Sequence, residues 1–289
     1  MIKLGDLNIK DIMLGDTPIK KVYRGTVLIW EKVVAVNFEA ETTAYISRVE
    51  ADGGEVINPT YVNEAFVLLK SKGILATDYS WLSASFGLIK DVNDNVSKLY
   101  SLKGAQWDLI GQQILSATWK ATGSQTSMPV IAFDKDRAVG FKPSVPIVLS
   151  QPNTIFSVHS TVYVGSNQYV YDGYSRSGRH LLLRQTGAYL VGASSYKNTA
   201  VGADVNTHII QVNFNGSSSS MYVDDITAIS STNIGTNVFD YISLGNYFNA
   251  ASQYSLGGDW SELLVLDGGI STADIEIREL LNEKYNTYT

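Results

Sequence analysis

Three carboxylates stand close together in the segment 50–55, which reads EADGGE. Glu50, Asp52 and Glu55 have the spacing E-x-D-x-x-E. Carboxylates that line one face of a β-strand can supply the nucleophile and the acid of retaining glycoside hydrolysis. Such a strand needs apolar residues between the carboxylates to face the core, but only one alanine and two glycines stand there. We therefore interpret the segment as a helix end that runs into a turn, and expect no catalysis from it.

The segment DVNDNV has the alternating oxygen ligands with which calcium loops begin. Asp91, Asn93 and Asn95 occupy alternate positions, as in an EF-hand. That loop also requires a glycine and a glutamate further on, where Val96 and Leu102 stand instead. We expect a turn here rather than a metal site.

Two aspartate pairs and the histidines complete the candidates for metal binding. An aspartate pair on the rim of a β-sandwich could bind calcium, but most such acids are solvated turn residues. The histidines have no acidic residue at metal-ligand spacing and are expected to be exposed or at strand edges. We predict no cofactor and no metal, with calcium as the alternative. The residues concerned are Asp134, Asp136, Asp224, Asp225, His159, His180 and His208.

Aromatic and polar side chains gather in two segments, NQYVYDGYSRSGRH and GNYFNAASQY. Aromatic faces stack on sugar rings, and Asn, Asp and Arg side chains form hydrogen bonds with hydroxyl groups. Alternatively, alternate tyrosines of a strand cover a face of the sheet or fill a subunit interface. The candidate carbohydrate-binding residues are Tyr169, Tyr171, Asp172, Tyr174, Arg176, Asn246, Tyr247 and Tyr254.

The segment 1–36 repeats with a period of about ten residues. Short β-branched runs flank a glycine in each row, which is typical of strand–turn–strand structure. We predict a small β-meander that is too short to bury a core alone and needs a neighbour, either its own domain or another polypeptide. The residues expected to make that contact are Leu4, Ile9, Leu14, Ile19, Val22, Ile29 and Trp30.

The remaining elements position these candidates. Residues 37–91 carry two helical patterns that end at glycines, then an aromatic-rich stretch expected to be a short helix or loop, so we predict a helical spacer. From residue 92 onward, short alternating runs separated by turn residues indicate a sandwich or barrel; in 208–214, for example, Ile210, Val212 and Phe214 share one face. A closing helix begins near Ser271 and places Ile277, Leu280, Leu281 and Tyr285 in one stripe.

Composition excludes several classes of protein. The chain of 289 residues has a net charge of −6 and no Lys/Arg cluster, which argues against nucleic acid as a partner. It has no cysteine, so disulfides and thiol chemistry are excluded. Asp6 and Asp11 interrupt the start where a signal peptide would be apolar, and no stretch reaches transmembrane length. We expect assembly in the cytoplasm and no membrane insertion.

Three stretches of 92–289 resemble the concanavalin A-like lectin/glucanase superfamily, in particular its laminin-G-like and pentraxin-like members. They are NTHIIQVNFNGSSSSMYVDD, YISLGN and the closing GGDWSELLVLDGGISTADIEIRELLNEKY, in which Gly258, Glu262, Leu264 and Ser271 match. Asp225 replaces the usual glycine after Asp224. The resemblance implies a mainly β, concanavalin A-like jelly-roll sandwich, preceded by the β-meander and the helical spacer.

The first ninety residues are similar to N-terminal segments of structural and fibre proteins of tailed bacteriophages, including crAss-like and other Bacteroidales phages. The resemblance rests on the repeat of 1–30 and on the spacing of Tyr79, Gly87, Val96 and Leu99. It implies a virion component in which residues 1–36 anchor the chain, 37–91 act as a spacer, and 92–289 form an exposed lectin-like domain.

Together these expectations describe a non-enzymatic structural protein of a phage head or tail fibre or decoration. Its partners would be other capsid or tail proteins, a second or third copy of the chain in a homodimer or homotrimer, and a host surface glycan. The alternative is a carbohydrate-binding module or lectin outside a virion. A lectin-fold glycoside hydrolase is the third option.

Overall fold

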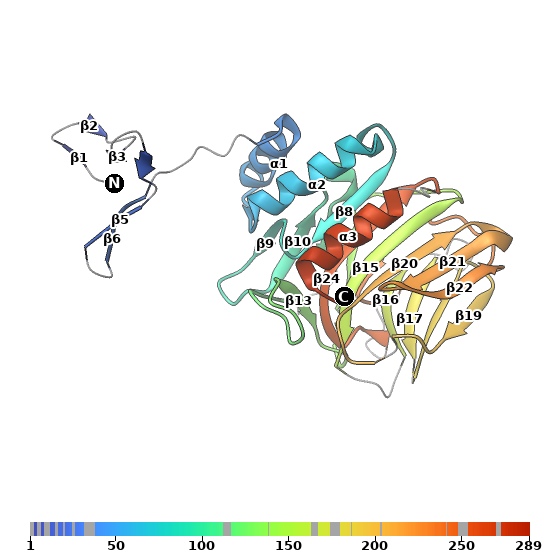
Figure 1. Ribbon diagram of the computed structural model, residues 1–289. Helices are drawn as coiled ribbons and strands as arrows, with labels where there is room; N and C mark the ends of the chain where they lie inside the picture. The colour runs from blue at the N-terminus through green and yellow to red at the C-terminus, as the bar shows by residue number, and fades with distance from the viewer. Residues whose placement is uncertain are drawn as a thin grey trace. The chain divides into compact units, whose positions relative to one another are not determined.

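The computed structural model confirms a mainly β protein whose two large sheets are antiparallel (Figure 1). It describes residues 38–111, 117–137, 139–162, 167–173, 180–185, 187–202, 204–240, 242–247, 254–269 and 273–289. Before residue 38 it describes only the backbone of six short strands. The chain divides into two compact units, Met1–Phe38 and Glu39–Thr289.

The first unit consists of three hairpins, each a two-stranded sheet of its own. In each hairpin, the paired residues stand on either side of the glycine of one repeat in the sequence, as Leu4 and Leu7 or Leu14 and Thr17 do. One hairpin per repeat explains the ten-residue period. The described strands therefore do not form the continuous meander that we predicted, because each pairs only with its hairpin partner. Of the expected contact residues, Ile9 lies outside the described residues, and Leu4, Leu14, Ile19, Val22, Ile29 and Trp30 lie on strands. The strands are β1 (Lys3–Leu4), β2 (Leu7–Asn8), β3 (Ile12–Leu14), β4 (Thr17–Ile19), β5 (Lys21–Arg24) and β6 (Val27–Glu31).

The smaller of the two large sheets has eight strands, and one long strand, β24, organises it. One edge of β24 pairs with β15 along nearly its whole length. The other edge is divided between β13, which pairs with its start, and β8, which pairs with its end. The order is β12 (Thr118–Lys120), β13 (Val130–Phe133), β24 (Gly258–Asp267), β15 (Asn153–Thr161), β20 (His208–Phe214), β21 (Ser219–Val223) and β22 (Ile226–Thr232), with β8 (Tyr79–Ser83) beside β24.

The second large sheet has ten strands and faces the first. Its order is β19 (Tyr196–Thr199), β18 (Ala188–Gly192), β17 (Leu181–Gln185), β16 (Gln168–Asp172), β23 (Ser243–Leu244), β14 (Phe141–Pro143), β11 (Leu109–Gly111), β10 (Val96–Tyr100), β9 (Gly87–Lys90) and β7 (Glu55–Val56). Neighbouring strands are often far apart in the sequence, so the described unit folds as one body.

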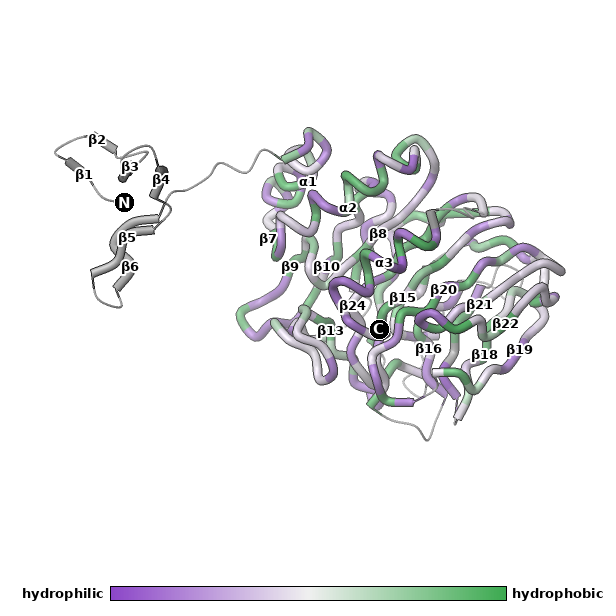
Figure 2. The backbone as a smooth tube through the Cα atoms, viewed as in Figure 1, coloured by the Kyte–Doolittle hydropathy of each residue, from purple (hydrophilic) through white to green (hydrophobic). Residues whose placement is uncertain are grey.

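Alternation along the central strands builds two hydrophobic cores. Ile155 and Val265 point between the sheets into the sandwich core, whereas Phe156 and Leu264 point to the opposite face of the eight-stranded sheet. That face is covered by the helices, whose hydrophobic and hydrophilic residues alternate in Figure 2. We call this second cluster the helix-side core. The eight-stranded sheet is thus buried on both faces.

The segment 37–91 is not the helical spacer that we predicted. The two helices are present as α1 (Ala40–Ala51) and α2 (Pro59–Ser71), and Asn58 caps α2 through a hydrogen bond from Tyr61 N to its side chain. However, the aromatic stretch that follows forms the strands β8 and β9. Trp81 and Leu82 are both fully buried, one on each face, so the strand lacks the polar alternation that marks strands in a sequence.

An ionic network fastens α1 to the ten-stranded sheet. Arg48 donates two hydrogen bonds from one nitrogen to the carboxylate of Asp108, at 2.8 and 3.1 Å, and a third to the carbonyl of Ser101. Tyr45 Oη donates to the carbonyl of Tyr100 and accepts from Gly87 N. These contacts make α1 an integral part of the sandwich unit.

The closing helix α3 (Ala273–Tyr285) confirms the predicted apolar stripe. Ile277, Leu281 and Tyr285 are buried in the helix-side core, and Leu280 packs partly against it. Ser271, expected to cap the helix, lies outside the described residues. No helix in the described part of the chain is long and apolar enough to cross a bilayer.

Candidate functional site

Three tyrosines from distant parts of the sequence meet beside the ten-stranded sheet. Tyr169 lies on β16, and Tyr247 and Tyr254 lie in the connection between β23 and β24. The ring centroids are 5.1 Å apart for Tyr169 and Tyr247, 5.8 Å for Tyr169 and Tyr254, and 5.4 Å for Tyr247 and Tyr254. All three side chains are half-buried and belong to neither hydrophobic core. We call them the tyrosine cluster.

Backbone hydrogen bonds hold both ends of the connection that carries two of these tyrosines. Gly245 N donates to the carbonyl of Val170, and Leu256 N donates to the carbonyl of Gly245. Gly245 has a φ of +74°, and a side chain there would collide with the ring of Phe133. Glycine is therefore required at this turn. Gly257 N completes the attachment by donating to Gln168 Oε1 on β16.

Asn246, which precedes Tyr247 in the chain, is a buried polar residue of this connection. Its side chain is 1% exposed, and its Oδ1 accepts a hydrogen bond of 2.6 Å from Tyr247 N. That bond fixes the orientation of the amide, because a backbone N–H can only donate. Among the described residues, Asn246 Nδ2 has no hydrogen-bond partner. A buried donor without a partner costs free energy, which a bound acceptor would recover.

The structure brings together four of the eight predicted carbohydrate-binding residues and buries two others inside the fold. Tyr169, Asn246, Tyr247 and Tyr254 converge as described. Tyr171 and Asp172 are 1% and 0% exposed, so the prediction that they contact a ligand is wrong. Tyr174 and Arg176 lie outside the described residues.

A β-bulge explains why Tyr169 and Tyr171 separate. Residues two apart on a regular strand share a face, which was the basis of the prediction. The register between β16 and β17 shifts between Tyr169 and Tyr171, however. A bulge of this kind redirects the side chains around it. Tyr171 enters the sandwich core, where burial raises its pKa well above the usual range.

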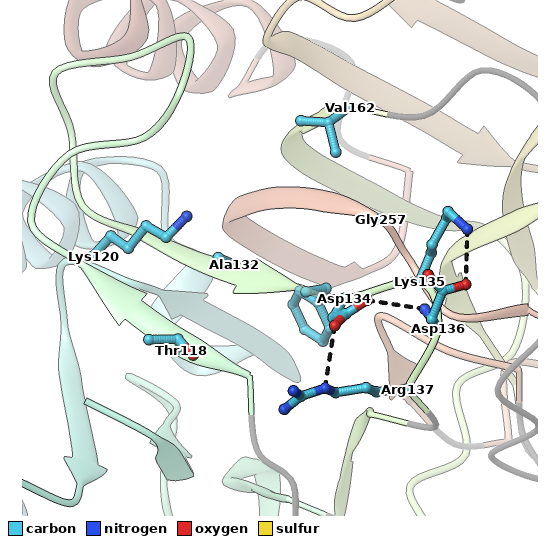
Figure 3. A pocket seen from close by; sticks show the side chains of 10 residues that line it. Thr118, Lys120, Ala132, Asp134, Lys135, Asp136, Arg137, Val162 and Gly257 are labelled. Carbon is cyan, nitrogen blue, oxygen red and sulfur yellow. Dashed lines mark hydrogen bonds and ion pairs between the residues drawn. The ribbon is translucent and has the colours of Figure 1, made fainter. Parts of the chain in front are cut away.

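A pocket of about 480 Å³ adjoins the same connection (Figure 3). Gly257 lines it, and Ser255 Oγ donates a hydrogen bond to the carbonyl of Arg137, another lining residue. The predicted calcium pair Asp134 and Asp136 is also here, but each carboxylate has a cationic partner. Asp134 pairs with Arg137 at 3.2 Å and Asp136 with Lys135 at 2.8 Å. Within the described residues, no cluster of three or more His, Cys, Asp or Glu side chains is arranged to hold a metal.

The carboxylates of the EADGGE segment do not form a catalytic pair. The predicted helix end is confirmed, since α1 ends at Ala51 and Asp52 follows it. Asp52 pairs with Lys98 at 2.7 Å and accepts from Tyr100 Oη, and these two partners lower its pKa. Glu55 lies on β7 and pairs with Lys90 instead. Glu50 is exposed on α1.

Of the two options expected for the histidines, exposed or at strand edges, exposure is wrong, because His159, His180 and His208 are all buried. His208 is the first residue of β20. Burial lowers the pKa of His159 to about 3 and that of His180 to about 4. For His208, burial acts in the same direction, but hydrogen bonds to Asp224 and Asp204 outweigh it and raise the pKa. Its Nδ1 lies 2.7 Å from Asp224 and its Nε2 lies 2.9 Å from Asp204. Both nitrogens must donate to carboxylates, so the ring is protonated and links the two loops that carry Asp204 and Asp224.

The sequence predictions assigned no chemical role to Glu262, which lies beneath the helices on β24. It accepts hydrogen bonds from Trp81 Nε1 at 2.8 Å, Ser83 Oγ at 2.8 Å and Tyr285 Oη at 2.7 Å. Burial raises its pKa to about 7, although these hydrogen bonds act against the shift. Its side chain is fully buried, so the carboxyl group holds α3 and β8 together and has no access to a substrate.

Comparison with known proteins identifies the fold. The sequence matches no protein-family model and no curated protein. Among solved structures, an arabinofuranosidase complexed with arabinofuranosyl-α-1,2-xylobiose is similar over 73% of this chain and 60% of its own, with 9% identity and a TM-score of 0.51.

Two further structural neighbours are smaller domains. Domain 4 of AbnA, a GH43 extracellular arabinanase from Geobacillus stearothermophilus, in complex with arabinotriose, has 10% identity over 62% of this chain and 91% of its own, with a TM-score of 0.47. The CBM40 of Ruminococcus gnavus IT-sialidase bound to α2,6 sialyllactose has 10% identity over 46% of this chain and 84% of its own, with a TM-score of 0.37. The structural neighbours are thus carbohydrate-binding modules and glycoside hydrolase domains.

Proposed function

We propose that this protein binds carbohydrate through the tyrosine cluster and Asn246, without cleaving it. The observation that carries the proposal is the convergence of Tyr169, Tyr247 and Tyr254, next to Asn246, whose amide donor has no hydrogen-bond partner among the described residues. Aromatic rings stack on the C–H faces of sugars, and an amide donor bonds a hydroxyl oxygen. The sandwich fold that the chain shares with the arabinofuranosidase makes carbohydrate the first class of ligand to test.

The arrangement of acidic residues supports binding without catalysis. Glycoside hydrolysis uses two carboxyl groups that flank one bond in an accessible site. Asp52 and Glu55 lie on different elements and each has a lysine partner, and Glu262 is sealed beneath the helices. Incubation with β-glucans is expected to release no reducing sugar, and release that Glu50→Gln abolishes would contradict this part of the proposal.

Glycan-array binding of the full chain tests the proposal. We expect discrete glycan signals that Tyr169→Ala abolishes, because the cluster loses one of its three mutually contacting rings. The matched control is Tyr196→Ala on β19, which removes a tyrosine that is 44% exposed and outside the cluster. Signals that survive Tyr169→Ala in a folded protein, or an array without any signal, would overturn the proposal.

A second proposed role, assembly into a larger particle such as a phage virion, is favoured by the N-terminal unit. Its hairpins have strands of two to five residues, and isolated two-stranded hairpins are marginal in water. Their β-branched repeat is therefore proposed as the surface that binds a capsid or tail protein or another copy of the chain. Removing residues 1–36 should abolish incorporation into particles and leave glycan binding intact. Normal incorporation of the shortened chain would exclude this role.

A further inference from the structure

The pocket of Figure 3 lies on the outer face of the eight-stranded sheet, at the strands β12 and β13. Ile131 and Phe133 on β13 point into the sandwich core, so Ala132 between them points to the opposite face. Thr118 stands directly opposite Ala132 in the ladder and therefore lies on the same face. These two short side chains line the cavity of about 480 Å³.

Lys120 on β12 contributes a cation to this pocket. Trp119 packs against the sandwich core, and its Nε1 donates a hydrogen bond of 3.0 Å to the carbonyl of Ala84. Because neighbouring side chains of a strand alternate, Lys120 lies on the pocket side, and Figure 3 shows it directed toward Ala132. Its Nζ has no hydrogen bond or ion pair within the described residues, so the amine is available to a ligand.

The turn after β13 places a second cation against the pocket. Arg137 N donates to the carbonyl of Asp134 at 3.1 Å. The carbonyl of Arg137 accepts hydrogen bonds from Val139 N and Ser255 Oγ, so its backbone is held on both sides. Arg137 Nε forms an ion pair of 3.2 Å with Asp134, and Figure 3 shows the guanidinium directed toward Thr118. The two terminal nitrogens have no partner in the described part of the chain and remain as donors.

The pocket has an excess of positive charge, although the chain as a whole has a net charge of −6. Its lining contains three cationic side chains and two carboxylates. Asp134 pairs with Arg137, and Asp136 pairs with Lys135. The charge that these pairs leave uncompensated is that of Lys120, which attracts an anionic group.

The two carboxylates restrict which anion can bind. The side chains of Asp134 and Asp136 are 52% and 77% exposed, so both keep oxygen lone pairs that can accept hydrogen bonds. An inorganic anion has no hydrogen-bond donor for them and is repelled by their charge. A sugar with an acidic group supplies hydroxyl donors as well as an anion. The cavity volume lies in the range of pockets that hold small ligands.

We infer that this pocket binds a sugar residue that carries a carboxylate or a sulfate ester. Lys120 and Arg137 bind the anionic group. The hydroxyl groups of the sugar donate to Asp134, Asp136 and Thr118. The inference goes beyond the proposed function, because none of these residues belongs to the tyrosine cluster. Ion pairs between exposed groups are weak, so a single acidic sugar should bind with a dissociation constant on the order of a millimolar. Such a complex is measured in solution, since it would not survive the washing of an array.

Matched pairs of acidic and neutral sugars test the inference by NMR titration of the full chain. The methyl glycosides of glucuronic and galacturonic acid are compared with those of glucose and galactose, and sulfated glucose is compared with glucose. We expect at least one acidic sugar to bind at least about tenfold more tightly than its neutral counterpart and than inorganic sulfate. The pair that shows the preference distinguishes a carboxylate from a sulfate ester. Raising NaCl from about 0.05 to about 0.5 M should weaken the binding, because salt screens exposed charges.

Variants of two lining residues connect the preference to the pocket. Lys120→Gln is expected to weaken binding of the acidic sugar at least about tenfold, whereas Lys120→Arg, which keeps the charge, should retain the affinity within about threefold. Ala132→Leu fills the cavity without changing any charge and should also weaken binding at least about tenfold. The matched control is Lys197→Gln on β19, which removes an exposed lysine outside the pocket and should leave the affinity unchanged.

Three results would each overturn the inference. They are equal affinity for acidic and neutral sugars or no binding of any acidic sugar, unchanged affinity in Lys120→Gln, and inorganic sulfate that binds as tightly as the acidic sugars. The last result would mean an adventitious ion only. None of the three bears on the proposed function, which is tested at Tyr169.

Discussion

The helix-side core and the tyrosine cluster use similar residues for opposite purposes. In the helix-side core, Trp81 and Tyr285 donate to a buried carboxylate, so both their rings and their polar atoms have protein partners. In the tyrosine cluster, the three half-buried rings contact one another, and the amide donor of Asn246 has no hydrogen-bond partner among the described residues. An aromatic cluster that is fully buried stabilises the protein, and we propose that the half-buried cluster binds a ligand.

The largest expected effect separates the two regions by stability. Trp81→Ala removes a fully buried ring and one donor to Glu262, so we expect the free energy of unfolding to fall by about 3–5 kcal/mol. Tyr247→Ala should cost about 1 kcal/mol, because its ring is only half-buried. Urea unfolding of both variants measures the difference. Equal losses would mean that the tyrosine cluster is a structural core.

A second prediction concerns the pH dependence of the helix-side core. Burial raises the pKa of Glu262 to about 7 in the folded protein, above its usual value of 4.5. The folded state therefore holds this proton more tightly than the unfolded state, and stability should fall as pH rises from about 4.5 to about 7. For Glu262 alone the loss is about 3 kcal/mol.

Urea midpoints at pH 5 and pH 8 measure this effect, with Glu262→Gln as the test variant. Asp274 on α3 accepts a hydrogen bond from Gln211, and burial raises its pKa to about 6, so it contributes a loss of the same sign. We expect Glu262→Gln to flatten the profile partly and the double variant with Asp274→Asn to flatten it further. If the stability of the double variant still depends on pH as in the unaltered protein, Glu262 and Asp274 are not the groups that titrate.

The smallest expected effect lies at His208, away from both regions. Hydrogen bonds to Asp224 and Asp204 raise the pKa of His208, so its contribution to stability is fully present below its usual pKa of 6.5 and is lost as pH rises through the folded pKa. His208→Gln should remove the contribution of His208 to the decline above pH 6.5 and leave the contribution of Glu262, which extends from about 4.5 to about 7. Asp204→Asn keeps the hydrogen bond between His208 and Asp224, so the pH dependence of its stability should lie between those of the unaltered protein and His208→Gln.

The sequence predicted the fold class wherever local periodicity and tertiary structure agree. Ile210, Val212 and Phe214 point into the sandwich core as their alternation indicated, and Ile277 and Leu281 face the sheet. It failed at β8, because a strand buried on both faces has no alternation to detect. It also failed at Tyr171 and at the burial of the histidines, because a β-bulge and the packing around a side chain are tertiary features.

Part of the candidate site was predictable, since aromatic loops rich in asparagine suggested Tyr169, Asn246, Tyr247 and Tyr254. Their convergence was not, because it depends on the attachment of Gly245 and Gly257 to β16. Nor could the spacing of the tyrosines in the sequence give the angles between their rings.

The divided edge of β24 has a consequence for how the chain is made. Ser83 on β8 bonds to Glu262, which the ribosome adds 179 residues later. Until then β8 presents an open edge and the helices before it lack their sheet, and contacts this distant in sequence form slowly. Chains that stop before Gly258 would retain that exposed edge. Slow or interrupted synthesis is therefore expected to favour aggregation through this edge.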